Sequence, residues 1–84
     1  MKSIHDVAYK LLIQKLKQTR LAANLTQTAL AKKLNVDQTY VSKYENRERR
    51  LDVVELRDVC KALKLNFAGF ISDYEKDLKN LNKK

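Results

Sequence analysis

The sequence predicts an all-α fold, because of its turn residues and the spacing of its apolar residues. Proline is absent and glycine occurs once among the 84 residues, so the connections between elements must be short. Apolar residues recur at intervals of three and four, and no stretch alternates at the two-residue period of a strand. The length suits one small domain. We therefore expect residues 1–84 to form a single five-helix bundle.

The first helix is predicted over about residues 6–23. Leu12, Ile13 and Leu16 share one side at helical spacing and should face the core. Asn24 should end the helix, since asparagine tolerates the left-handed backbone conformation found at helix C-termini. This helix is longer than a small core requires.

Two short helices and a tight turn are predicted over residues 26–45. Thr26 is placed to cap the first helix of the pair, whose apolar positions recur at helical spacing. The chain must reverse at Asn35, and asparagine accepts positive φ. Asp37 should cap the second helix, on which Val41 and Tyr44 mark the buried side. Such a unit braces one helix with the other and presents the second helix outward.

Two further helices are predicted to complete the chain. The fourth spans about residues 52–63, with Asp52 as its cap and an apolar side made by Val53, Leu56, Val59, Cys60 and Leu63. The fifth is capped by Asn66 and extended, with apolar positions Phe67, Phe70, Ile71, Tyr74, Leu78 and Leu81. That stripe runs beyond what a small core needs.

The charge balance predicts a polyanionic partner. The chain carries 18 basic and 10 acidic residues, a net charge of +8, and its pI is about 9.8. The excess falls in the first two thirds of the chain, which includes the two-helix unit, and this location favours nucleic acid. A uniformly solvated surface is the simpler alternative for basic charge.

The sequence lacks the residues that several classes of function require. Cys60 is the only cysteine, so no disulfide or cysteine-based metal cluster can form within one chain. We see no paired carboxylates in a recognisable context, no glycine-rich phosphate loop and no activated nucleophile, and so expect no enzyme activity, metal or cofactor. Residues 1–10 lack a signal-peptide core, and no membrane span is apparent, so we expect a cytoplasmic protein.

Over about residues 16–71 the sequence resembles the Cro and phage-repressor type of helix-turn-helix regulators, the XRE-like family. The matching positions are Leu16, Arg20, Leu25, Thr26, Gln27, Leu30, Ala31, Val41, Ser42, Lys43, Tyr44, Glu45, Arg49, Arg50, Leu51 and Asp52. The resemblance implies a five-helix bundle that binds double-stranded DNA with its third helix in the major groove, usually as a dimer on a palindromic operator. Asn24, Asn35 and Arg47 stand where such proteins often carry glycine, and Arg47 is the least conservative of the three.

Candidate base-reading residues lie on the predicted outer side of the third helix: Gln38, Thr39, Ser42, Lys43 and Asn46. Glutamine pairs with adenine, lysine donates to guanine, and the threonine methyl contacts that of thymine. An ordinary solvated face would look similar on an isolated surface helix. The preceding helix and turn favour base contact here.

Candidate phosphate-binding residues flank that helix. Gln27 lies in the first turn of the second helix, where the helix dipole favours an anion, and the resemblance implies that it clamps the DNA backbone and braces Gln38. Tyr40 could donate to a phosphate or pack at the rim of the bundle. Arg47, Arg49 and Arg50 follow the third helix directly and should contact phosphates without reading sequence.

Two charged residues are predicted to be structural. Arg20 and Glu45 each lie beside apolar neighbours, where a lone charge is costly. We expect them to pair, and the resemblance implies that this bond ties the first helix to the end of the third.

A dimer is predicted because one helix-turn-helix unit contacts too few base pairs to find an operator. The expected dimer residues are Phe70, Tyr74, Leu78 and Leu81, joined by Ile4, Val7 and Leu11 of the extended first helix. Alternatively, the two extended helices pack on each other within one monomer.

The leading functional hypothesis is a sequence-specific transcriptional regulator that acts as a homodimer on an operator. The alternative is an antitoxin-like interaction module whose C-terminal helix binds a partner protein. Nonspecific binding of RNA or an anionic membrane is a third hypothesis.

Overall fold

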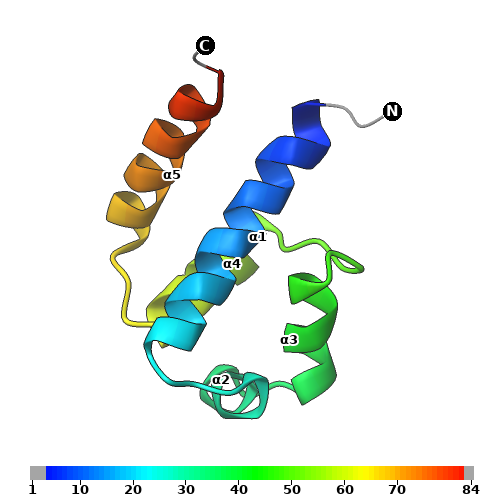
Figure 1. Cartoon of the computed structure of the whole chain (residues 1–84). Helices are drawn as coiled ribbons and strands as arrows, with labels where there is room; N and C mark the ends of the chain where they lie inside the picture. The colour runs from blue at the N-terminus through cyan, green and yellow to red at the C-terminus, as the bar shows by residue number, and fades with distance from the viewer. Residues whose placement is uncertain (1–3, 83–84) are drawn as a thin grey trace.

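Five α-helices make up the part of the chain described by the computed structural model, residues 4–82 (Figure 1). The helices are α1 (Ile4–Ala22), α2 (Gln27–Leu34), α3 (Gln38–Glu45), α4 (Val53–Ala62) and α5 (Phe67–Asn82). The predicted all-α, five-helix fold is confirmed, and α1 and α5 are the long helices at 19 and 16 residues. No helix within residues 4–82 combines the length and apolar character needed to cross a bilayer.

The two long helices pack against each other and run antiparallel, so the start of α1 and the end of α5 lie at the same end of the molecule (Figure 1). The Tyr74 hydroxyl donates a 2.8 Å hydrogen bond to the Ala8 carbonyl oxygen. Lys15 Nζ lies 2.7 Å from Asp77 Oδ2. The two extensions therefore pack on each other within the monomer. At the other end, α2 packs against α3 and α4.

The core lies where all five helices meet. Its largest fully buried side chains are Tyr44, Leu16, Leu30, Val41, Val59 and Cys60. Burial raises the pKa of the Cys60 thiol to about 11, so this thiol stays protonated and unreactive at neutral pH. This agrees with its predicted role as a small core residue.

Val53 is an exception to the predicted core, because 70% of its surface is exposed. Asp52 and Val54 beside it are also exposed. The start of α4 thus lies at the edge of the bundle, and Leu56 is the first buried residue of this helix. The predicted inward position of Val53 is wrong, and the core side of α4 is formed by Leu56, Val59 and Cys60.

Side-chain caps begin three of the helices as predicted. Thr26, Asp52 and Asn66 each accept a hydrogen bond from the backbone amide three residues later, at 3.0, 2.7 and 2.7 Å. These bonds satisfy amides that have no partner inside the helix. Asp37 also occupies the position before α3, but its side chain makes no cap bond. Asp37 therefore occupies the predicted N-cap position, but the predicted cap bond from its side chain is not formed.

The first four helices end in the same left-handed turn, and none of these turns contains glycine. Asn24, Asn35, Arg47 and Lys64 have φ values of 60°, 60°, 62° and 62°. After α3, for example, the Arg47 amide donates to the Tyr44 carbonyl at 3.0 Å and the next amide donates to the Lys43 carbonyl at 2.8 Å. This pair of bonds is the Schellman motif. The predicted left-handed ends at Asn24 and Asn35 are confirmed, and Arg47 adopts the left-handed conformation that glycine commonly takes at a helix end.

Replacing Lys64 by glycine should stabilise the protein by up to about 1.5 kcal/mol. A side chain other than asparagine costs about 1–2 kcal/mol in this conformation, whereas glycine loses about 0.5–1 kcal/mol more backbone entropy on folding. Lys64 is exposed, so its side chain contributes little packing. We expect the melting temperature to rise by a few degrees in a thermal unfolding experiment. Asn35→Gly is the matched control and should change it little; equal shifts in both variants would contradict the strain argument.

Candidate nucleic-acid interface

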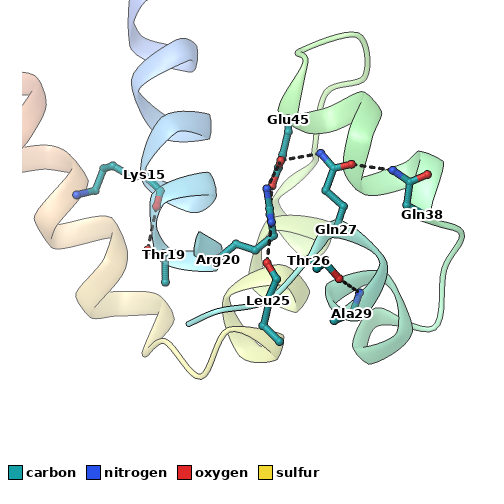
Figure 2. Close-up of polar contacts among 9 residues, drawn as sticks. All are labelled: Lys15, Thr19, Arg20, Leu25, Thr26, Gln27, Ala29, Gln38 and Glu45. Atoms are coloured by element: carbon teal, nitrogen blue, oxygen red, sulfur yellow. Dashed lines mark hydrogen bonds and ion pairs between the residues drawn. The ribbon is translucent and has the colours of Figure 1, made fainter. Parts of the chain in front are cut away.

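A buried ion pair anchors the end of α3 to α1 (Figure 2). Arg20 donates from Nε and Nη2 to the two Glu45 carboxylate oxygens at 2.7 and 3.0 Å, and from Nη1 to the Leu25 carbonyl at 2.7 Å. Arg20 is 5% exposed and Glu45 8%. The hydrogen bond to Glu45 raises the pKa of Arg20, although burial opposes this shift. The predicted structural pair is confirmed, in the bidentate form that holds a carboxylate most firmly.

Two glutamines extend this ion pair to the surface (Figure 2). Gln27 Nε2 donates to Glu45 Oε1 at 3.0 Å, and Gln38 Nε2 donates to Gln27 Oε1 at 2.7 Å. The predicted bracing of Gln38 by Gln27 is confirmed. We call the chain Arg20–Glu45–Gln27–Gln38 the polar relay. It links α1, α2 and both ends of α3, and so fixes the orientation of α3.

The outer side of α3 carries the polar residues that the helical wheel places there. Gln38, Thr39, Lys43 and Asn46 are exposed, and Ser42 is half-buried. Burial of Val41, Tyr44 and Glu45 on the other side explains this orientation. The predicted base-reading residues thus lie on one side of α3, with Ser42 partly covered.

The three arginines after α3 differ in their surroundings. Arg47 is exposed in its left-handed turn. Arg49 Nη2 lies 2.6 Å from Glu55 Oε2, and the guanidinium carbon of Arg49 lies 4.3 Å from the centre of the Tyr40 ring. Arg50 is exposed, with its guanidinium carbon 4.4 Å from the centre of the Tyr9 ring. The charge of Arg49 is therefore largely compensated within the protein, whereas Arg47 and Arg50 present theirs to solvent.

Tyr40 packs at the rim of the bundle, the second of its two predicted roles. Its ring meets that of Tyr44 edge to face, with the centroids 6.1 Å apart and an interplanar angle of 81°. The Arg49 guanidinium also lies over the ring. Burial raises the pKa of Tyr40, so its hydroxyl remains a donor at neutral pH.

Tyr9 and Glu55 shape this region, although neither residue was predicted to have a role. Tyr9 lies on α1 and accepts a 3.2 Å hydrogen bond at its hydroxyl from the Leu51 amide. Glu55 pairs with Arg49 and completes a capping box with Asp52. The Arg49 hydrogen bond lowers the pKa of Glu55. The spacing of Asp52 and Glu55 is a recognisable capping-box signal, whereas the position of Tyr9 indicates only an inward-facing aromatic side chain.

The residues predicted to form a dimer contact fall into two groups. Phe70 is 6% exposed in the core, and Tyr74 bonds α1 through its hydroxyl, so both side chains are used within the monomer. Leu78 is half-buried, and Leu81 is 49% exposed. On α1, Val7 is 40% exposed and Leu11 half-buried; the side chain of Ile4 lies outside the described residues.

Known proteins match most of the chain in sequence and fold. The HTH_3 helix-turn-helix family model matches residues 16–70. An uncharacterized transcriptional regulator in the ATPase CF(0) region of Rhodospirillum rubrum is 35% identical over 63 residues, which are 75% of this chain and 58% of that protein. The chain thus spans little more than half the length of this curated relative.

Solved structures share the fold over nearly the whole chain. An XRE-family like protein from Pseudomonas syringae pv. tomato str. DC3000 is 41% identical with a TM-score of 0.84, covering 87% of this chain and 89% of that one. The wild-type restriction-modification controller protein C.Esp1396I is 28% identical with a TM-score of 0.79, covering 94% and 99%. C.Esp1396I has also been solved as a tetramer in complex with its natural 35 base-pair operator, with a TM-score of 0.77, 28% identity and coverage of 92% and 97%.

The extent of these matches, together with the repressor-like arrangement of α2 and α3, identifies the family. This protein belongs to the Cro-repressor-like, XRE-type helix-turn-helix family, which consists of transcriptional regulators rather than enzymes.

Proposed function

We propose that this protein is a cytoplasmic transcriptional regulator that binds a specific operator as a homodimer, with α3 in the major groove. The polar relay is the observation that carries the proposal. In this relay Gln38 donates one of its two Nε2 hydrogens to Gln27. Its other hydrogen and its side-chain carbonyl oxygen remain available to a base. One donor and one acceptor are what adenine requires in the major groove.

Phosphate contacts on both sides of α3 support the same orientation. The Gln27 amide uses one of its two hydrogens for Glu45, which leaves the other for a phosphate at the first turn of α2. Beyond the end of α3, Arg47 and Arg50 are exposed. The net charge of +8 adds a general attraction to DNA. Operator binding by C.Esp1396I, a protein with the same fold, supports the assignment.

The homodimer is proposed through the end of the molecule where α1 begins and α5 finishes. Leu81 and Val7 are exposed at this end, and Leu78 is half-buried. Phe70 and Tyr74 contribute by holding α5 against α1 rather than by direct contact with the second copy. A dimer places two reading helices on one duplex, which doubles the number of base pairs read.

Selection of bound sequences from a random duplex pool tests this function. We expect enrichment of one site with two inverted half-sites about one helical turn apart, and a dimer in sedimentation experiments at micromolar concentration. A shuffled duplex of the selected composition is the control and should bind at least about a thousandfold more weakly. Failure to enrich any duplex would refute the DNA-binding function; a single half-site and a monomer would refute only the homodimer.

A further inference from the structure

The loop between α3 and α4 is held from α1 by one aromatic side chain. The loop returns toward the N-terminal half of α1 after leaving α3 (Figure 1). There the Tyr9 hydroxyl accepts a hydrogen bond from the Leu51 amide at 3.2 Å, and the Tyr9 ring carries the Arg50 guanidinium, 4.4 Å from its centre. Tyr9 thus contacts two successive loop residues that lie more than forty positions away in the chain.

The surroundings of Arg50 leave its charge available. No carboxylate within the described residues forms an ion pair with Arg50, and its side chain is exposed. A guanidinium lying on an aromatic face is attracted to the ring, while the N–H groups along its edges stay free to donate. The Tyr9 ring therefore restricts the direction of Arg50 without neutralising it.

Arg49 provides the contrast within the same loop. It also lies on a tyrosine ring, at 4.3 Å from the centre of Tyr40, but Glu55 approaches it at 2.6 Å. An arginine held by a carboxylate and a ring stabilises the loop. An arginine held by a ring alone can still bind an anion beside α3.

We infer that Tyr9 is a positioning residue for DNA binding, which holds Arg50 in the direction of a phosphate flanking the major groove. The inference rests on the proposed function. Arginine normally loses much side-chain freedom when it binds a phosphate. Stacking on Tyr9 restricts that freedom before the DNA arrives, so the contact forms at a smaller entropic cost.

The test is a double-mutant cycle on the duplex recovered by selection, with affinity measured by fluorescence anisotropy at several salt concentrations. Arg50→Ala should weaken binding to all duplexes alike and make the slope of log affinity against log salt shallower by about 0.9 for each protomer, which is about 1.8 for the proposed dimer. Tyr9→Leu should weaken binding by about twofold to fivefold, yet have almost no further effect in the Arg50→Ala background. Leu21→Ala, which removes an exposed apolar side chain elsewhere on α1, is the control and should not couple to Arg50.

Arg50→Lys tests the same inference without changing the packing of α1. Lysine keeps the charge, and with it the salt slope, but lacks the planar group that lies on the ring. We expect the same twofold to fivefold loss. Independent effects of Tyr9→Leu and Arg50→Ala, or full affinity in Arg50→Lys, would overturn the positioning role alone. A wild-type protein that binds no duplex would overturn the proposed function and this inference together.

Discussion

Glu45→Ala is expected to lower the free energy of unfolding by about 3–5 kcal/mol, the usual cost of removing one partner from a buried ion pair. The substitution leaves the Arg20 guanidinium, 5% exposed, with only the Leu25 carbonyl as a partner. It also removes the acceptor of the Gln27 amide. For a domain of this size the melting temperature should fall by at least about 10 °C in a thermal unfolding experiment.

Glu48→Ala is the matched control for this prediction. Glu48 carries the same charge three residues later but is exposed, so its removal should change the free energy of unfolding by less than about 0.5 kcal/mol. Similar melting temperatures for Glu45→Ala and the wild type would show that the ion pair does not hold α3 on the bundle.

Gln38→Ala is expected to abolish the preference for one base pair of the operator while leaving the fold intact. Gln38 is exposed, so little packing is lost. A bidentate contact to adenine discriminates by about 1–3 kcal/mol, which corresponds to a preference of about fivefold to 150-fold. We expect that preference to approach one in the variant when dissociation constants are measured for operators substituted at each position.

Gln18→Ala provides the comparison for a lost amide side chain. Gln18 is exposed two residues before Arg20, and therefore on the opposite side of α1 from the polar relay. Its substitution should leave all base preferences unchanged. If Gln38→Ala weakens every operator variant equally, Gln38 contacts the DNA backbone instead of a base.

Local sequence patterns were sufficient to predict much of the fold and part of the site. Helical spacing locates the five helices, because each must bury one side. The residue types at Thr26, Asp52 and Asn66 reveal their caps, since short polar side chains accept bonds from free amides. The Arg20–Glu45 pair could be predicted because charges beside apolar neighbours need partners.

The arginines after α3 could not be told apart by such patterns. Arg49 and Arg50 are adjacent and chemically identical, yet one is bound to Glu55 and the other is stacked on Tyr9. The difference depends on how α1 and α4 pack around the loop, which is set by contacts distant in the chain. The exposure of Val53 has the same origin, because which residues lie at the edge of the bundle depends on how the helices pack together.

The left-handed helix ends at Arg47 and Lys64 bear on how this fold can diversify. Altering base preference requires substitutions on α3, and most substitutions lower stability. Lys64→Gly would compensate for part of that loss whichever residue of α3 is changed, because it acts at a position remote from the reading surface. The stability added by Lys64→Gly would offset the cost of substitutions on α3, so new operator preferences could evolve while the protein stays folded.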